Sequence, residues 1–177
     1  MQKGHVFWFI GLHGSGKTTI SKEFAKLLRN KGILVVVLDG DELRQIISSD
    51  LEYTIDDRNE HMKRVADLSK LLSENYINCI ACVASPTEKS REYAKKQIQN
   101  ITTVYVKCPI EICEKRDVKW HYKKARNKEK GFENFLGVSL KFEEPNNADI
   151  VLNTDKETIQ ESVDKLLSVS KNRKIIV

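Results

Sequence analysis

The stretch from Gly11 to Thr19 reads Gly-Leu-His-Gly-Ser-Gly-Lys-Thr-Thr, and its residue types and spacing are those of a loop that binds nucleotide phosphates. It matches the pattern G-x-x-x-x-G-K-S/T, in which glycines let the backbone curl so that successive N–H groups point at phosphate oxygens. In such a loop Lys17 reaches the β- and γ-phosphates, and the Thr18 hydroxyl ligates Mg²⁺. The residues expected to contact ATP here are Gly11, Gly14, Ser15, Gly16, Lys17, Thr18 and Thr19.

Two carboxylates follow an apolar run at 33–38, in the sequence Leu38-Asp39-Gly40-Asp41. If that run is a strand of a parallel sheet, both acids lie at the carboxyl edge of the sheet, where ligands bind. Phosphoryl transfer to a hydroxyl needs a carboxylate to accept or orient the proton, and often a second to hold Mg²⁺. The alternative for Asp39 is a helix cap, and one residue can do both. The catalytic residues expected are therefore Lys17, Asp41 and Asp39, and one of the two carboxylates could join Thr18 in holding the Mg²⁺ ion.

Two arginines and a tyrosine indicate an anionic acceptor. Arg44 follows the acidic pair, and Arg58 lies near the start of a long helical pattern. A guanidinium donates to two oxygens of a phosphate or sulfate at once, so both arginines could face such a group. Tyr53 precedes the helical pattern and could stack on a base, although a single tyrosine is more often part of a core.

Short apolar runs alternate with helical patterns along the chain. The apolar runs predict strands at 5–10, 33–38, 77–84, 102–107 and 149–152. The helical patterns lie at 17–31, 41–48, 56–75, 87–99, 110–126 and 155–168. Strands that are apolar almost throughout are typical of a parallel sheet covered on both faces. We predict one α/β domain over residues 1–177, with a parallel sheet and helices on both faces.

The segment 123–147 breaks this alternation, because it is highly charged and its apolar residues have no steady period. A loop this long inside a compact domain is often a functional lid, and a basic lid can close over ATP and exclude water. The alternative is a solvated helix end followed by a flexible loop. Phe132, Phe135 and Phe142 favour the lid, because these side chains are poorly suited to permanent exposure.

The charge and the apolar segments of the chain exclude some classes of function. The 177 residues carry a formal net charge of +5, which suits an anionic small-molecule substrate and gives no sign of nucleic-acid binding. No apolar stretch approaches the roughly 20 residues of a membrane span. The apolar run before the phosphate loop is also too short for a signal peptide. We therefore expect a cytoplasmic protein that binds neither nucleic acid nor membrane.

Cys79 and Cys82 form a C-x-x-C pair inside a strand-like run. Positions i and i+3 of a strand face opposite sides of a sheet, so the two thiols cannot converge on a metal ion. We predict buried free thiols here rather than a zinc or redox site.

These motifs, together with several others, resemble those of the adenylylsulfate kinases over residues 5–167. In this chain the motifs are Leu38–Arg44, Tyr53–Arg58, Ser85-Pro86, Cys108–Asp117, Tyr122–Arg126 and Asn134–Gly137. The resemblance implies a P-loop NTPase fold of the nucleotide-kinase type with a mobile lid, and the use of Mg²⁺ and ATP. It also implies phosphorylation of a ribose 3′-hydroxyl. The leading acceptor is adenosine 5′-phosphosulfate, which would become 3′-phosphoadenosine 5′-phosphosulfate.

The resemblance also implies roles for single residues. Asp41 would be the base or the group that positions the acceptor hydroxyl, and Asp39 would hold the Mg²⁺ ion with Thr18. Tyr53 and Phe135 would lie on either side of the acceptor base, and Arg116 would lie near the adenine of ATP. The residues expected to bind the acceptor are Arg44, Tyr53, Arg58, His61, Ser85, Phe135 and Lys123. Because members of the family are commonly homodimers, a homodimer is expected as well.

The chain departs from the family pattern at positions that would contact the acceptor. His61 stands where the family has asparagine, Glu88 where it has arginine, and Trp120-His121 where it has glycine and leucine. The acceptor therefore stays open between adenosine 5′-phosphosulfate and a related nucleotide such as cytidine diphosphoramidate, the substrate of a kinase class in capsule biosynthesis. A non-catalytic module that senses ATP is a third hypothesis, against which the intact Lys17 and Asp41 argue.

Overall fold

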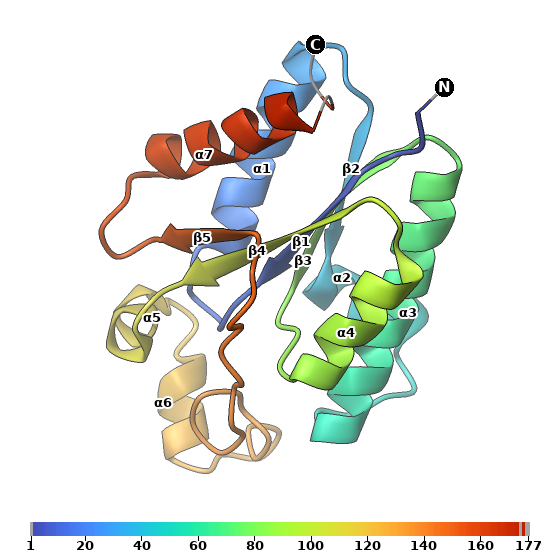
Figure 1. Cartoon of the computed structure of the whole chain (residues 1–177). Helices are drawn as coiled ribbons and strands as arrows, with labels where there is room; N and C mark the ends of the chain where they lie inside the picture. The colour runs from blue at the N-terminus through green and yellow to red at the C-terminus, as the bar shows by residue number, and fades with distance from the viewer. Residues whose placement is uncertain (1, 174, 176–177) are drawn as a thin grey trace.

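The computed structural model describes residues 2–173 and residue 175. Five parallel strands form one sheet in the order β2-β3-β1-β4-β5, which crosses the middle of Figure 1. The strands are β1 (Val6–Ile10), β2 (Val35–Asp39), β3 (Asn78–Val83), β4 (Ile101–Lys107) and β5 (Ile150–Asn153). The predicted parallel sheet is confirmed, and each predicted strand is found with only small differences at its ends.

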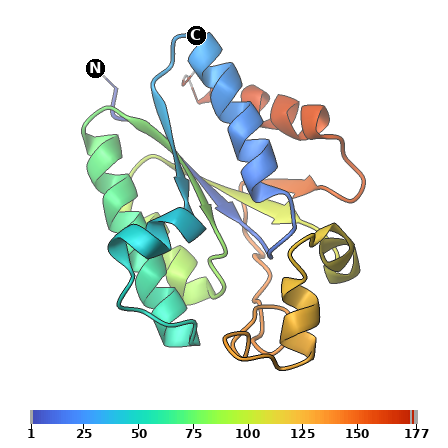
Figure 2. The same cartoon turned by 180° about the vertical axis from the view of Figure 1, so that it is seen from behind.

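Strand β1 lies in the centre of the sheet, between β3 and β4. Because all the strands are parallel, the segments that follow them meet at one edge of the sheet. The phosphate loop after β1 therefore lies at the middle of this carboxyl edge, with Asp39 at the end of β2 and Thr154 just after β5. Figure 2 shows the loop between β1 and α1 (Lys17–Asn30) from behind.

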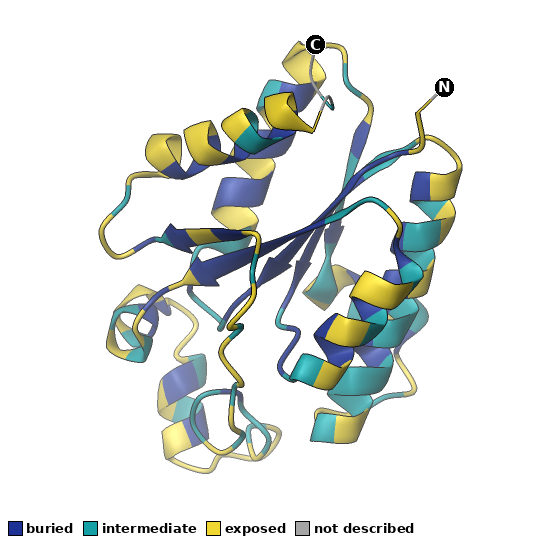
Figure 3. Ribbon diagram, in the orientation of Figure 1, coloured by how far each residue is buried: buried dark blue, intermediate teal, exposed yellow. Residues whose placement is uncertain are grey.

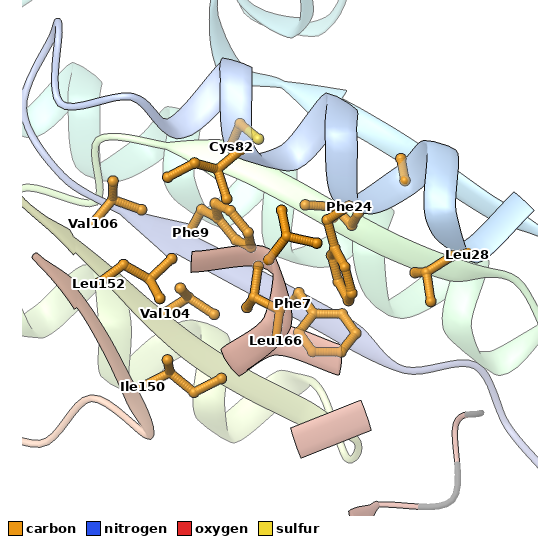
Figure 4. Close-up of a cluster of buried hydrophobic side chains, with 14 of the residues drawn as sticks. Phe7, Phe9, Phe24, Leu28, Cys82, Val104, Val106, Ile150, Leu152 and Leu166 are labelled. Carbon is orange, nitrogen blue, oxygen red and sulfur yellow. The ribbon is translucent and has the colours of Figure 1, made fainter. Parts of the chain in front are cut away.

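Helices cover both faces of the sheet, as predicted. Helices α1 and α7 (Ile159–Asn172) cover one face, and α2 (Gly40–Ile47), α3 (Ile55–Glu74) and α4 (Glu88–Gln97) cover the other. Alternate residues of β1 enter the two cores, because successive side chains of a strand point to opposite faces. Phe7 and Phe9 pack with Phe24 and Leu166 in the core shown in Figure 4.

Trp8 lies in the second core, against residues of α2, α3 and α4. In Figure 3 the central strands are buried throughout, and the helices are exposed only on their outer faces. This double covering explains why the strands are apolar in nearly continuous runs.

The two thiols of the C-x-x-C pair lie on opposite faces of β3, as predicted. Cys79 belongs to the second core and Cys82 to the first. Both are buried free thiols, and burial raises the pKa of Cys79 to about 12 and that of Cys82 to about 11. Protonated, buried thiols of this kind do not act as nucleophiles or metal ligands.

The single helix predicted at 110–126 is wrong, because the chain turns in its middle. Helix α5 (Ile110–Arg116) ends before Asp117, and α6 (His121–Arg126) begins after Trp120, whose φ of 59° is left-handed. The Asp117 carboxylate stabilises this turn by accepting the backbone N–H groups of Lys119 (3.2 Å) and Tyr122 (2.8 Å). The charged periodic pattern continues through the turn and conceals it.

The last helix also differs from its predicted range of 155–168. Helix α7 begins at Ile159, because Thr158 and Glu161 form a capping box at its N-terminus. Thr158 accepts the backbone N–H of Glu161, and the Glu161 side chain accepts that of Thr158. The threonine and glutamate at this spacing are a sequence signal for a helix start.

The segment predicted as a lid, 123–147, begins inside α6 and continues as a loop that leads to β5. Figure 1 shows α6 and this loop together beyond the carboxyl edge of the sheet. Phe135 packs in a small core with Cys113 and Tyr122, and Phe142 packs against the second core. Among the residues that the structure describes, every helix is too short or too polar to span a lipid bilayer.

Candidate active site

The phosphate loop has the backbone conformation that its glycines permit. Gly14 and Gly16 have left-handed φ values of 76° and 102°, where a side chain would strain the backbone. Within the described part of the chain, the Ser15 hydroxyl is a buried side-chain oxygen with no hydrogen-bond partner. A curled loop that carries an unpaired hydroxyl fits an anion bound in its concave side.

Lys17 is the first residue of helix α1, and its side chain lies over this loop. Its ammonium donates to the carbonyl oxygens of Gly11 (2.8 Å) and Leu12 (2.7 Å). An ammonium has three N–H donors, so one remains for a phosphate oxygen. Burial lowers the pKa of Lys17, while the nearby Asp41 and Asp39 carboxylates act in the opposite direction.

Replacing Gly14 with alanine is expected to weaken ATP binding by about tenfold or more. The left-handed φ alone costs about 1–2 kcal/mol for a residue with a Cβ. The added Cβ would also lie 2.8 Å from the carbonyl oxygen of Cys113. Isothermal titration with a non-hydrolysable ATP analogue measures the change.

Gly32 is the matched control, because its φ is also left-handed (75°) but nothing lies within 4 Å of the position that a Cβ would take there. Gly32→Ala should lower stability by a similar backbone cost and leave nucleotide affinity unchanged. Equal affinity losses in the two variants would contradict the role of the loop conformation.

Asp39 connects the phosphate loop to α2. One of its carboxylate oxygens accepts the backbone N–H of Asp41 (3.0 Å), which caps α2. The other accepts the hydroxyl of Thr18 at 3.2 Å. Asp39 therefore caps the helix and also faces the phosphate loop, so its role as a cap is compatible with a role at the bound phosphates. The hydroxyl and carboxylate oxygens so paired are the hard donors that Mg²⁺ prefers.

Asp41 lies on the first turn of α2, near enough to cationic side chains of the phosphate loop, α2 and α3 for its charge to act on them. Burial lowers the pKa of Lys17, Arg44 and Arg58, and in each case the Asp41 carboxylate acts against that change. One carboxylate thus lies near both the phosphate-loop lysine and the arginine pair. This position suits a group that works between a donor phosphate and an acceptor.

The structure brings Arg44, Tyr53 and Arg58, three of the residues expected to bind the acceptor, into one cluster. The two guanidinium carbons lie 4.6 and 5.2 Å from the centre of the Tyr53 ring. Arg58 also donates to the backbone carbonyl of Asn134 at 2.7 Å, which brings the loop residue before Phe135 to the cluster. Burial and the neighbouring Arg44 lower the pKa of Arg58 to about 10. A crowded pair of arginines such as this is stabilised by binding an anion.

His61, expected to bind the acceptor, lies in the interior of the protein instead. Its side chain is buried, at 2% exposure, and both ring nitrogens bond within the protein. Nδ1 lies 2.9 Å from the Ser48 hydroxyl, and Nε2 lies 3.1 Å from the carbonyl oxygen of Gly40. His61 therefore holds the two ends of α2 against α3, and positions Asp41 and Arg44 rather than contacting an acceptor directly.

This burial predicts a pH effect on stability. Burial lowers the pKa of His61 to about 4, well below its ordinary value of 6.5. The unfolded chain therefore binds more protons than the folded chain between these two values, and stability falls as the pH falls from about 6.5 towards 4. We expect His61→Asn to flatten the decline of Tm across this range. Thermal unfolding from pH 7 to pH 5 tests it, and parallel curves for both proteins would contradict it.

Two other expected acceptor residues have partners within the protein. Ser85 is buried, and its hydroxyl bonds to Trp8 Nε1 and to Ser90 Oγ, both at 3.2 Å. This side chain is therefore committed to the core, which corrects the expectation of an acceptor contact. The ammonium of Lys123 lies 5.2 Å from the Trp120 ring on an exposed turn of α6.

Hydrogen bonds of Thr154 connect Arg116 to the phosphate loop. The sequence motifs do not indicate Thr154. The Arg116 guanidinium donates to the carbonyl and hydroxyl oxygens of Thr154, at 2.7 and 3.3 Å. The Thr154 hydroxyl also contacts the carbonyl oxygen of Ser15 at 2.8 Å. The only sequence signal for Thr154 is its place directly after a strand, at the carboxyl edge of the sheet.

Tyr122 begins one of the sequence motifs, but the sequence does not predict its contact with the phosphate loop. Its hydroxyl donates to the carbonyl oxygen of His13 at 2.8 Å and so ties α6 to the phosphate loop. Its ring also contacts Phe135, with centroids 5.0 Å apart. A buried tyrosine that reaches a loop more than a hundred residues away leaves no local trace in the sequence.

The chain is similar to known proteins over nearly its whole length. A family model described as adenylylsulphate kinase matches residues 3–153. The adenylyl-sulfate kinase of Halothermothrix orenii is 45% identical over 166 residues, which cover 94% of this chain and 89% of the relative. That of Clostridium acetobutylicum is 42% identical over 176 residues, covering 99% and 87%. The structure of the Mycobacterium tuberculosis APS kinase in complex with AMPPNP and APS superimposes with a TM-score of 0.91 at 30% identity, over 97% of this chain and 99% of that chain. The chain therefore belongs to the adenylylsulphate kinase family.

Proposed function

We propose that this protein transfers the γ-phosphoryl group of ATP to the ribose 3′-hydroxyl of adenosine 5′-phosphosulfate. The product would be 3′-phosphoadenosine 5′-phosphosulfate. The observation that carries the proposal is that hydrogen bonds join Thr18 of the phosphate loop to Asp39 and Asp39 to Asp41, while Arg44 and Arg58 pack on the Tyr53 ring beside them. Family membership and the names of the relatives support it.

In this transfer the protein forms no covalent bond to the substrates. It positions them and stabilises the charge that develops. The 3′-oxygen forms a bond to the γ-phosphorus while the bond from that phosphorus to the β,γ-bridging oxygen breaks, and ADP leaves. Asp41 orients the attacking hydroxyl and accepts its proton. Lys17 and the N–H groups of the loop stabilise the negative charge on the transferring group.

Thr18 and Asp39 would hold Mg²⁺ when ATP is bound. Their oxygens already face each other at 3.2 Å, and they come from the phosphate loop and the end of β2. A magnesium ion held there would neutralise charge on the β- and γ-phosphates.

The acceptor would bind at the arginine cluster. Arg44 and Arg58 carry the donors that a sulfate or phosphate group accepts in pairs. Tyr53 is about half exposed, with 49% of its surface accessible, and offers a ring face to the acceptor base. Phe135, next to the carbonyl that Arg58 contacts, would lie on the other side of that base. His61 supports this cluster from behind through α2.

The segment 123–147 would close over the bound nucleotides as a lid. Two contacts already connect α6 and this segment with the site, from Arg58 to Asn134 and from Tyr122 to His13. A basic lid brought over the phosphates would exclude water from the transfer and suppress hydrolysis of ATP.

A coupled assay of ADP release tests the proposed reaction. With Mg²⁺ and ATP, adenosine 5′-phosphosulfate should give rapid turnover and a product heavier by one phosphate, which mass spectrometry identifies. Cytidine diphosphoramidate and a reaction without acceptor are the two comparison arms. Turnover with cytidine diphosphoramidate alone would replace the acceptor, and tight ATP binding without any turnover would leave only a sensor.

Two further proposals concern the number of domains and the oligomeric state. We infer that residues 1–177 form one domain, because one sheet and its two cores include all the strands described. The expected homodimer stays a prediction, which light scattering coupled to gel filtration measures directly. A mass of one chain, 20.4 kDa, would contradict it.

A further inference from the structure

Three side chains with metal-binding atoms meet beside the phosphate loop, and the proposed reaction uses none of them. His13 lies within the loop, Asp117 follows α5, and His121 begins α6. Their ligand atoms all lie within 4.8 Å of one another. In the part of the chain that the structure describes, this is the one group of three or more such side chains so close together.

The carboxylate of this group is held in place before any ion binds. Asp117 is 2% exposed at its side chain, and its oxygens accept the backbone N–H groups of Lys119 and Tyr122. Asp117 Oδ1 also lies 3.5 Å from His13 Nε2. This separation matches the edge of a tetrahedron around an ion with bonds of about 2 Å. Outer hydrogen bonds that fix a ligand are typical of built metal sites.

The two imidazoles lie close together across the gap between the loop and α6. The ring centroids of His13 and His121 are 4.9 Å apart, tilted by 38°. Phe132 lies 5.4 Å from the His121 ring, and Phe135 lies 6.2 Å from the His13 ring, so aromatic side chains line one side. The side chain of His13 is 37% exposed, which leaves an entry from solvent.

A simple ion pair does not explain the whole group. It would account for His13 and Asp117, but it gives no reason for a second imidazole to lie beside the first. His121 brings that second imidazole from a different element, as the first residue of α6.

We propose that His13, Asp117 and His121 bind a divalent transition-metal ion, with Zn²⁺ as the best match. Two imidazole nitrogens and one carboxylate oxygen favour Zn²⁺ over Mg²⁺, which prefers oxygen ligands alone. Three protein ligands leave one position for water. Bound there, the ion joins the phosphate loop to α6, at a place distinct from the Thr18–Asp39 pair.

Untagged protein, stripped with a chelator and desalted, tests the site without nucleotide. Isothermal titration with Zn²⁺ should show one ion per chain, and Tm should rise with the Zn²⁺ concentration, because the ion binds only the folded state. Co²⁺ should give the intense visible absorption of a tetrahedral site. Absence of one-to-one binding in the unmodified protein overturns the proposal by itself.

Variants locate the ion. His121→Leu removes one imidazole and keeps a side chain of similar size, and it should weaken Zn²⁺ binding at least tenfold, since losing even an outer partner typically costs about 10–100-fold. His13→Ala should do the same, and the double variant should lose the stoichiometric site. Lys115→Ala, an exposed change on the neighbouring helix α5, should bind Zn²⁺ as the unmodified protein does. Unchanged affinity in a folded His121→Leu variant, checked by circular dichroism, would place the ion elsewhere and overturn the assignment. Neither result depends on which acceptor the enzyme uses.

Discussion

Replacing Lys17 with alanine is expected to lower kcat by about 10²–10³-fold, which is the typical cost of removing one preorganised donor from a developing anion. The Lys17 ammonium lies over the phosphate loop with one N–H donor free, close to the Asp41 and Asp39 carboxylates. In the variant, the transferring phosphoryl group loses its nearest protein cation. The loop also loses the two hydrogen bonds that hold the Gly11 and Leu12 carbonyls. ATP affinity should therefore fall as well, and kcat measured at saturating ATP separates the two effects.

Lys26→Ala is the control for this experiment, because Lys26 lies on the exposed face of the same helix α1. Its kcat should match that of the unmodified protein. A Lys17→Ala enzyme that retains full kcat would show that the loop amides and the metal alone stabilise the transferred group.

The second large effect is expected from Asp41→Asn. General-base catalysis typically contributes about 10²–10⁴-fold, and we expect kcat to fall within this range while the Kd for ATP stays nearly unchanged. The amide keeps the size and the hydrogen-bonding shape of the carboxylate but cannot take the hydroxyl proton. It also removes the negative charge that acts on Lys17, Arg44 and Arg58.

Glu42→Gln provides the matched control, since Glu42 is the adjacent exposed carboxylate on the first turn of α2. It should leave kcat within about twofold of the unmodified protein, as surface changes away from a site usually do. If Asp41→Asn changed only the affinity for ATP, Asp41 would be a metal ligand or a structural residue rather than the base.

Much of the fold is predictable, because its signals are local. Strands buried on both faces are apolar in short runs, and the phosphate loop marks the first strand and the helix after it. The edge position of Asp39 and Asp41 follows for the same reason, since residues that follow parallel strands share one edge. The predicted fold is confirmed by the parallel sheet and by the likeness to a solved APS kinase.

The differences arise where a side chain reaches a distant partner. Asp117 reverses the chain by accepting N–H groups at Lys119 and Tyr122, and nothing in the surrounding charged pattern predicts this turn. The resemblance to the kinase family implies an acceptor contact for His61. Its bonds to Ser48 and Gly40 depend on how α2 packs against α3, which only the structure provides.

The start of α7 is a difference of another kind. The capping signal of Thr158 and Glu161 is present in the sequence, but the charged residues before it also favour a helix and place the predicted start too early.

The four buried cysteines can report which part of the protein unfolds first, because they lie in different parts of the structure. Cys79 and Cys82 lie on opposite faces of the sheet, and Cys113 lies under the Phe135 loop with Cys108 beside it. A small alkylating reagent can reach each thiol only when the layer above it opens. Peptide mapping after brief labelling would therefore record, region by region, whether the loop around Phe135 loosens before either main layer, and whether nucleotide slows that opening.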